Sequence, residues 1–541
     1  MVVAALLGAV LAAPAGSWHF TEVAASAGVL VEHDFVQGIN GAPRIMAGGA
    51  AAGDLDGDGW PDLLTLRGDL DPPLVAFRNR GDGRFDDVTA AWGLRLPGGV
   101  IPNGVVLGDV DGNGWLDVLL GGQEGFGPRL FLNQGGHFVD ATAASGLASM
   151  RDSWSLALGD IDADGDLDLA LGHWSVGRGG AGHLWQNDGQ GHFRDIGGPA
   201  GIDAAFTGID WSFTPSFGDL DGDGRPELLF AADFGTSRVF HNQGGGRFVA
   251  TTGPEITDEN GMGSALGDFD NDGDLDWFVA SIWDPNGVAE SDWGVTGNRL
   301  YRNRGDGRFE DATETAGVRQ GYWGWGSSFG DFDNDGFLDI FHVNGFSAFF
   351  ASEFHEDPAR LFVNRGDGTF TERSAELGVA DTGQGRGIVC FDYDRDGDLD
   401  LFVQNNQGPT RLFRNDGGNA GHFLAVRLLG RSPNTSAVGA RLYLRAGGRT
   451  QMRELAAGSN YLSANPIEAH FGLGGATRID ELRVRWPDGS WSLERDLAVD
   501  QLLVLGEPGI GVAVPLLGSS SLLLLSVVLA ACGVLALRLR A

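Results

Sequence analysis

Short acidic segments suited to coordinating a hard cation recur along this sequence. A nine-residue pattern, D-x-D-x-D/N-G-x-x-D/E, begins at seven positions. Carboxylates packed this closely repel one another unless a cation lies among their oxygens, and Ca²⁺ accepts about six to eight oxygen ligands in flexible geometry. The pattern therefore predicts up to seven structural calcium sites. They begin at Asp54, Asp109, Asp160, Asp219, Asp268, Asp331 and Asp392.

The predicted ligands of each loop are the side chains at positions 1, 3, 5 and 9 and the backbone carbonyl of position 7. Position 6 is Gly in every copy, as a sharp turn requires. Position 7 varies widely, which is tolerable where the backbone is the ligand. Two loops differ, since Asn113 replaces a carboxylate and Glu227 is one methylene longer than Asp. The ligand residues are Asp54, Asp56, Asp58, Trp60, Asp62, Asp109, Asp111, Asn113, Trp115, Asp117, Asp160, Asp162, Asp164, Asp166, Asp168, Asp219, Asp221, Asp223, Arg225, Glu227, Asp268, Asp270, Asp272, Asp274, Asp276, Asp331, Asp333, Asp335, Phe337, Asp339, Asp392, Asp394, Asp396, Asp398 and Asp400.

A helical calcium loop of the EF-hand or dockerin type is the main competing interpretation. It would need a bidentate Glu at position 12 and a helix after it. Position 12 is never Glu here, and each loop is followed by a short apolar run typical of a buried β-strand. The remaining alternative is a solvated acidic turn that binds nothing.

The charge of the chain is concentrated in these loops. The 541 residues include 73 acidic and 37 basic residues, a formal net charge of −36, and 30 of the acidic residues lie in the seven loops. Such acidity repels phosphate backbones, so we expect no nucleic-acid partner. Every basic residue is arginine, which excludes a lysine Schiff base and a P-loop lysine.

The loops alternate with a second recurring element, an Asn and a Gly-rich turn leading to Phe, as in Asn79 with Phe85 and Asn303 with Phe309. Such turns are hairpin signals, so each unit of around 56 residues contains about four strands and fits one propeller blade. The seventh unit lacks its last strand after Asn415, but residues 20–24 supply one. We therefore predict an all-β fold: a seven-bladed β-propeller, a small β-domain and a C-terminal transmembrane helix.

These motifs resemble known families. The loops and hairpins of residues 20–415 are similar to the FG-GAP or VCBS-type repeats of integrin α-subunit propellers. Residues 439–442, 458–463, 470–474 and 484–489 resemble the ASPIC and UnbV domain. The pairing is similar to the cartilage acidic protein family and its bacterial relatives. The resemblance implies an exported calcium-binding propeller with a small β-domain behind it, and it implies no reaction.

The two ends of the chain predict its location. Residues 1–15 are an uncharged apolar run with a small-residue cleavage site, typical of a signal peptide although no basic residue precedes Arg44. Residues 522–537 are almost wholly apolar and precede Arg538 and Arg540, which predicts one membrane-spanning helix. A buried core helix and a cleaved sorting tail are the alternatives. We expect an exported protein anchored at the cell surface, with Cys390 and Cys532 unpaired.

The resulting domain plan is a signal peptide at residues 1–15, the propeller at 16–420, the ASPIC/UnbV-like domain at 421–507 and the tail at 508–541. Loops on the face opposite the metals carry most of the aromatic residues. These rings either bind a glycan or protein ligand, or they plug the central channel or pack between blades, and the second interpretation is slightly favoured for any single residue. They are Trp174, Trp211, Trp283, Trp293, Tyr322, Trp323, Trp325 and several residues of 346–355.

The leading functional hypothesis is a calcium-stabilised binding or adhesion module, and no catalytic residue is assigned. The match to G-x-S-x-G at residues 326–330 precedes an acidic loop and a strand, not a helix, so it is a repeat strand. The alternative is a polysaccharide lyase or hydrolase on the same scaffold, and a purely structural matrix component is a third possibility. Candidate acids and bases for an enzyme are Asp233, Asp284, Asp292, Glu353 and His355.

Overall fold

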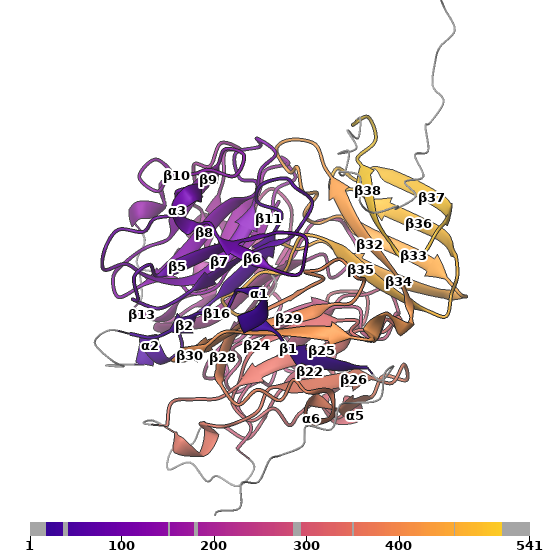
Figure 1. Cartoon of the computed structure of the whole chain (residues 1–541). Coiled ribbons are helices and arrows are strands. Elements are labelled where there is room, and N and C mark those ends of the chain that lie inside the picture. The colour runs from indigo at the N-terminus through magenta and orange to yellow at the C-terminus, as the bar shows by residue number, and fades with distance from the viewer. Residues whose placement is uncertain are drawn as a thin grey trace, which may run out of the picture.

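The computed structural model describes residues 18–35, 42–149, 152–177, 182–284, 294–348, 351–458 and 460–510. β-Strands dominate this part of the chain, and its α-helices are single turns of four residues. Seven similar antiparallel sheets occur in the described residues between 19 and 416, and in each of them one acidic loop joins two paired strands. Figure 1 shows them in indigo to orange, with the C-terminal sheets in orange to yellow beside them.

The strands of the first six sheets follow one another in chain order, except that β13, which lies between β12 and β14 in the sequence, pairs in the fourth sheet. Their strands are β3 (Ala50–Gly53), β4 (Asp62–Leu66), β5 (Leu74–Asn79) and β6 (Phe85–Asp87); β7 (Ile101–Gly108), β8 (Asp117–Gln123), β9 (Arg129–Asn133) and β10 (Phe138–Asp140); β11 (Leu156–Gly159), β12 (Asp168–Leu171), β14 (Leu184–Gln186) and β15 (Arg194–Asp195); β13 (Trp174–Gly177), β16 (Ile209–Gly218), β17 (Glu227–Ala232), β18 (Arg238–Asn242) and β19 (Phe248–Ala250); β20 (Ser264–Gly267), β21 (Asp276–Val279), β22 (Arg299–Asn303) and β23 (Phe309–Asp311); β24 (Gly324–Gly330), β25 (Asp339–Asn344), β26 (Arg360–Asn364) and β27 (Phe370–Glu372).

The seventh sheet takes its outer strand from the N-terminal part of the chain. It consists of β28 (Gln384–Phe391), β29 (Asp400–Asn406), β31 (Arg411–Asp416) and β1 (His19–Glu22). Phe20 pairs with Asn415, just as Phe85 pairs with Asn79 in the first sheet. The predicted completion of the last repeat by the start of the chain is therefore confirmed.

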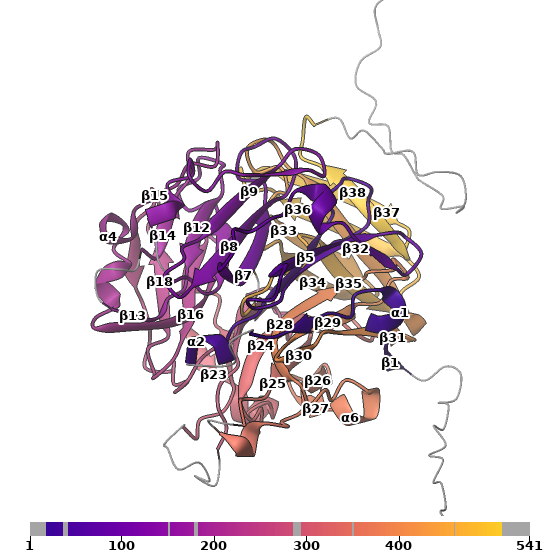
Figure 2. The same ribbon diagram turned by 60° about the vertical axis from the view of Figure 1, so that its left-hand side comes forward.

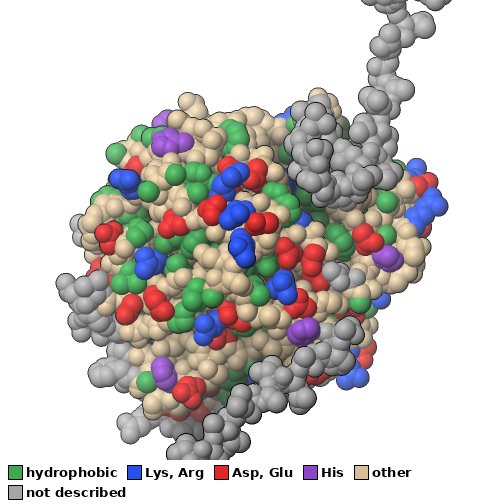
Figure 3. Space-filling model, viewed as in Figure 1, with side chains coloured by type: hydrophobic (Ala, Val, Ile, Leu, Met, Phe, Trp, Pro, Cys, Tyr) green, Lys and Arg blue, Asp and Glu red, His purple; other side chains and the backbone are tan. Residues whose placement is uncertain are grey.

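The first strands of the sheets lie side by side in chain order, and β28 returns to contact β3. Apolar side chains of the second strands, such as Leu64, Leu119 and Leu169, are fully buried between neighbouring sheets. The predicted all-β architecture is thus confirmed as a repeat-rich, propeller-like fold, which Figure 2 shows from a second direction. Figure 3 shows arginine side chains scattered among acidic ones on the face seen in Figure 1.

A second β-structure follows the repeats. It contains a sheet of β35 (Ala469–Gly474), β32 (His422–Leu429) and β38 (Gln501–Gly506) and a sheet of β34 (Arg449–Glu454), β33 (Arg441–Ala446), β36 (Ile479–Arg485) and β37 (Trp491–Leu497). Leu424, Leu442, Leu482 and Trp486 belong to its buried core. We refer to residues 421–510 as the second domain.

Short elements complete the fold. Several one-turn helices follow an outer strand and end at a Gly with positive φ, as α1 does at Gly28 and α3 at Gly93. The α-helices are α1 (Ala24–Ala27), α2 (Ala42–Ile45), α3 (Thr89–Trp92), α4 (Gly197–Ala200), α5 (Thr313–Ala316) and α6 (Ser374–Leu377). The 3₁₀ turns are Leu147–Ser149, Asp203–Ala205, Ser352–Phe354 and Gly418–Ala420, and β2 (Glu32–His33) pairs with β30 (Gly408–Pro409).

The expected membrane anchor is corrected by the structure. No helix within the described residues is long and apolar enough to cross a bilayer. The apolar segments on which the signal peptide and the anchor were based, together with Cys532, lie outside the described residues. Cys390 is buried and unpaired.

Candidate metal loops and ligand face

The acid at position 9 of each loop ties the loop to the third strand of its own sheet. Asp62 accepts hydrogen bonds from the backbone N–H groups of Leu55 and Asn79, each 2.9 Å long. The same pair of bonds recurs at Asp117, Asp168, Glu227, Asp276, Asp339 and Asp400. A carboxylate has about four lone-pair sites, so these acids retain sites for a metal.

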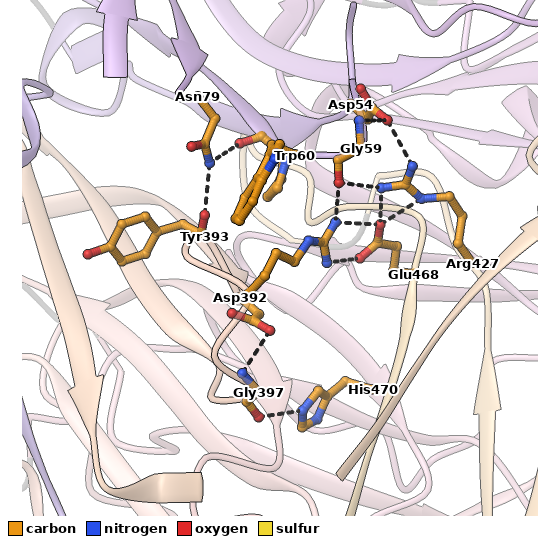
Figure 4. A network of polar contacts seen from close by, with 12 residues as sticks. Asp54, Gly59, Trp60, Asn79, Asp392, Tyr393, Gly397, Arg427, Glu468 and His470 are labelled. Carbon is orange, nitrogen blue, oxygen red and sulfur yellow. Dashed lines mark hydrogen bonds and ion pairs between the residues drawn. The ribbon is translucent and has the colours of Figure 1, made fainter. Parts of the chain in front are cut away.

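The Asn on the third strand links each sheet to the preceding one. Asn133 donates from Nδ2 to the carbonyl of Leu55, at 2.9 Å, and to that of Leu116, at 3.0 Å. The inter-sheet bond recurs at Asn187, Asn242, Asn303, Asn364 and Asn415. Asn79 makes the corresponding bond of 2.8 Å to Tyr393 in the last sheet (Figure 4). The sequence marked these residues only as hairpin signals, and their role as inter-sheet links was missed.

The remaining loop acids converge on one another. The position-1 carboxylate accepts the N–H of the position-6 Gly in every loop, as Asp54 does from Gly59 at 3.0 Å. Oxygens of Asp54, Asp56 and Asp58 lie within 4.8 Å of one another, and similar groups form in other loops. The position-6 glycines have φ between 91° and 100°, which explains the requirement for Gly.

The electrostatics of the loops fit a bound dication. Several buried oxygens in the described loops have no hydrogen-bond partner: Oδ1 of Asp54, Asp162, Asp166, Asp219, Asp270 and Asp394. Burial and then the neighbouring carboxylate of Asp335 raise the pKa of Asp331 to about 8. Burial likewise raises the pKa of Asp62 to about 8. Buried charges of this kind are normally paired or bound to a metal, so the donor set is suited to Ca²⁺.

The second domain covers the face that carries the loops. Arg427 Nη1 lies 2.8 Å from Asp54 Oδ2, and its guanidinium also bonds Glu468 (Figure 4). The N–H of Gly472 donates to Asp331 Oδ2 at 3.0 Å. Although Glu468 is buried, Arg395 and Arg427 lower its pKa to about 2. The loop face is therefore an interface within the chain.

A segment of the second domain also fills the centre of the repeat ring. Ala457 bridges to Leu158 and Ala464 to Ala51, both on innermost strands. Between them Tyr461, fully buried, packs against Phe213 and Trp325, with ring centroids 5.6 and 5.3 Å apart. Residues 456–458 and 460–465 thus plug the channel from the loop side.

Residues 42–49 close the channel from the opposite side. The buried Arg386 guanidinium donates to the carbonyl of Ile45, and Asn406 Nδ2 donates to that of Ala47 at 2.8 Å. Burial lowers the pKa of Arg386 to about 9. Its guanidinium carbon also lies over the ring of Trp325, 4.1 Å from the ring centroid.

The aromatic residues predicted for the opposite face divide into two groups. Trp323, Trp325, Phe346 and Phe354 are buried, so for them the interpretation as rings that plug the channel or pack between blades holds. Trp174, Trp211, Trp283, Tyr322 and His355 are half-buried, and Trp293 lies outside the described residues.

Trp174 and Trp211 form a partly exposed surface with Phe234, which sequence reasoning missed. Their ring centroids lie 5.3 Å (Trp174 to Trp211) and 4.7 Å (Trp211 to Phe234) apart. Phe234 is 53% exposed and has a left-handed φ of 54°. We call these three residues the aromatic surface.

Comparisons with known proteins agree with this architecture. A family model for FG-GAP-like repeats matches residues 54–120, 117–171, 174–230, 219–279, 288–342 and 346–403, and one for ASPIC and UnbV matches 430–511. The chain belongs to the FG-GAP-like repeat family. This FG-GAP-repeat protein is also homologous to cartilage acidic protein 1: it is 26% identical to the mouse protein over 493 residues, covering 84% of this chain and 72% of that protein. The human protein is 26% identical over 480 residues, covering 82% and 69%.

Among solved structures, the FG-GAP-repeat protein is similar to an Agrocybe aegerita lectin that recognises non-reducing terminal N-acetylglucosamine. The match has 17% identity and a TM-score of 0.38 and covers 67% of this chain and 86% of the lectin.

The candidate acids and bases of an enzyme have different surroundings in the described part of the FG-GAP-repeat protein. Asp233 accepts a hydrogen bond of 3.0 Å from Trp174 Nε1, and burial raises its pKa to about 7. Glu353 is exposed and Asp284 buried, while His355 contacts the carbonyl of Phe346. Asp292 lies outside the described residues.

Proposed function

We propose that the FG-GAP-repeat protein is a seven-bladed, calcium-stabilised propeller that binds a glycan or protein ligand on the face opposite its metal loops. The blade count is supported by the seven sheets of the described residues and by the contact of β28 with β3. Because the second domain covers the loop face, the ligand is assigned to the opposite face. The opposite face keeps the aromatic surface.

Bound Ca²⁺ supplies positive charge to loops that are otherwise rich in buried, unpaired carboxylate oxygens. The predicted ligand residues hold it, with position-9 acids such as Asp62 also bracing the loop against the third strand. Position-1 acids such as Asp54 connect the loops to the second domain. The loops therefore act structurally, and recognition belongs to the other face.

Phe234 is the observation that carries the binding proposal. A left-handed backbone at a non-glycine residue costs about 1 kcal/mol or more, and burying a Phe side chain instead of exposing it contributes about 1.5–3 kcal/mol. At Phe234 the protein bears the cost of the left-handed backbone and gives up part of the stabilisation from burial, and the ring is exposed beside Trp211. Strained residues of this kind cluster at ligand sites. An exposed aromatic ring supported edge to face by a second ring suits the apolar face of a sugar or a side chain of a partner.

The test is ligand screening with a variant that removes the ring without straining the backbone. Asn tolerates the left-handed region, so Phe234→Asn retains the fold. On a glycan array and in protein pull-downs, we expect this variant to bind the selected ligand at least about tenfold more weakly, as for an interface hot spot. Val249→Asn, on the outer strand β19, is the control and retains affinity. Unchanged affinity in Phe234→Asn would contradict the proposal, and no ligand in either screen would favour a structural matrix component.

One observation favours the polysaccharide lyase or hydrolase alternative. Asp233 directly precedes Phe234, and its pKa of about 7 lies near the range in which a general acid or base works best. Incubation with a polysaccharide panel, followed by assays for reducing ends and unsaturated products, tests this function. Activity that disappears in Asp233→Asn would replace the binding proposal with the enzymatic one.

A further inference from the structure

The fourth loop differs from the other six by presenting a histidine to its carboxylates. His241 precedes Asn242 on β18, the position held by Arg78, Gln186 and Arg302 in other repeats. In those repeats the side chain pairs with the position-3 acid, as Arg302 does with Asp270 at 3.6 Å. His241 occupies the same place with a nitrogen that can bind a metal.

The geometry of this group matches a metal site. His241 Nδ1 lies 3.1 Å from Glu227 Oε1 and 3.5 Å from Asp221 Oδ2. Ligands about 2.0–2.2 Å from one ion in a tetrahedral arrangement lie roughly 3.4 Å apart. Glu227 replaces the usual Asp of position 9, and its extra methylene extends the carboxylate toward His241.

A buried oxygen without a partner provides an independent observation. Asp219 is 6% exposed, and its Oδ1 makes no hydrogen bond. Arg485 and Arg441 approach only the other oxygen, Oδ2, at 3.2 and 3.8 Å. One oxygen of Asp219 lies within 4.8 Å of oxygens of Asp221 and Asp223.

The net charge around the fourth loop also matches one dication. Four acids, Asp219, Asp221, Asp223 and Glu227, face two arginines, Arg225 and Arg485. Arg441 is closer to Glu454, at 2.7 Å, than to Asp219. The excess of two negative charges equals the charge of one divalent ion.

We propose that the fourth loop binds a first-row transition-metal dication of the zinc type through His241, Asp221, Glu227 and Asp219. Ca²⁺ takes oxygen ligands, whereas imidazole combined with carboxylates suits zinc and its neighbours. The other loops offer oxygen ligands only, so the fourth loop has a different metal preference. This site is separate from the aromatic surface and does not depend on the ligand bound there.

Cobalt titration of the full, untagged chain tests the site. After chelation and dialysis, the protein is saturated with Ca²⁺ and titrated with Co²⁺ while visible absorption is recorded. We expect d–d bands that saturate at one equivalent and disappear when Zn²⁺ is added. In His241→Arg the affinity for Co²⁺ falls at least about tenfold, and the shift of the melting temperature by Ca²⁺ remains, which shows that this variant is folded.

His192→Asn is the matched control, because His192 is an exposed histidine outside the loops, paired with Asp188. It leaves the cobalt bands unchanged. Absence of the bands from the calcium-saturated wild type, or bands of equal intensity in His241→Arg, would overturn the proposal. Ligand screening with Phe234→Asn gives its result independently of either outcome.

Discussion

The hydroxyl of Tyr461 donates a hydrogen bond of 2.8 Å to the backbone carbonyl of Met46, 415 residues earlier in the chain. Tyr461 belongs to the segment that enters the repeat ring from the second domain, and Met46 to the segment that closes the other side. The two segments meet inside the ring. The second domain is therefore anchored to the interior of the propeller-like fold as well as to its loop face.

Tyr461→Phe tests this contact. Removing the hydroxyl leaves the buried Met46 carbonyl without a donor, which costs about 1–2 kcal/mol in the free energy of unfolding. We expect faster amide hydrogen exchange in residues 42–49, measured by mass spectrometry. Tyr443→Phe on β33, where the ring packs near Trp491, is the control. Exchange in residues 42–49 that is unchanged in Tyr461→Phe would contradict this role.

A second prediction compares two of the Asn links. Asn79 joins the first sheet to the last, whereas Asn133 joins the second to the first, and each also accepts an N–H from its hairpin turn, at 2.9 Å in both cases. If the ring is closed, Asn79→Ala and Asn133→Ala lower the free energy of unfolding by similar amounts, roughly 2–3 kcal/mol. Urea denaturation measures both. A much smaller loss for Asn79→Ala would show that the joint between the two ends contributes little.

Removal of calcium is expected to destabilise the protein. At roughly 1 mM Ca²⁺ and a Kd near 0.1 mM, each occupied site adds about 1.4 kcal/mol. A calcium-selective chelator should therefore lower the melting temperature, measured by calorimetry, and added Ca²⁺ should restore it. Mg²⁺ at the same concentration is the control. A melting curve that the chelator does not move would exclude structural calcium.

The loop acids also predict how pH acts on the metal-free protein. The folded-state pKa of Asp331 and that of Asp392 are each about 8, well above the ordinary value of 3.8. Their contribution to stability is complete below pH 3.8 and is lost as pH rises through 8. With chelator present, the free energy of unfolding should fall by at least about 2 kcal/mol between pH 5 and 8. Saturating Ca²⁺ should reduce this fall, and an equal fall with and without Ca²⁺ would contradict the assignment.

A separate pH effect is predicted for His183, which lies between Asp203 and Asp210 at 2.9 and 2.7 Å. Burial opposes its charge, but the hydrogen bonds to these acids raise its pKa from 6.5 to about 9. Its stabilising effect is complete below pH 6.5 and is lost as pH rises through 9, a change of about 3 kcal/mol. In saturating Ca²⁺, His183→Gln should flatten the unfolding profile between pH 6.5 and 9.5. The exposed His192→Gln should leave the profile as in the wild type.

Local spacing explains why much of the fold is predictable. The loop pattern and the Asn-to-Phe hairpins each depend on neighbouring residues, so the sheets and the pairing of Phe20 with Asn415 follow from them. The covering of the loops does not, because Arg427 reaches Asp54 across 373 residues. No local sequence pattern predicts a contact between residues so far apart in the chain.

Which of the aromatic residues are buried is likewise not predictable from local sequence. Hydrophobicity alone does not separate Trp325, buried against Tyr461, from Trp211, half-buried beside Phe234. The difference depends on which segment fills the channel. That segment, residues 456–465, is recognisable in the sequence only as a family motif.

The pairing of β1 with β31 has a consequence for biosynthesis. Trp18 bonds to Asn415, 397 residues later, so the outer strand of the last sheet emerges from the ribosome long before its partner exists. The intervening sheets can form during translation, since domains generally fold as the N-terminal parts emerge. The final sheet can be completed only after translation has passed Asn415, and until then the nascent chain carries an unpaired strand that a chaperone or a second nascent chain can capture.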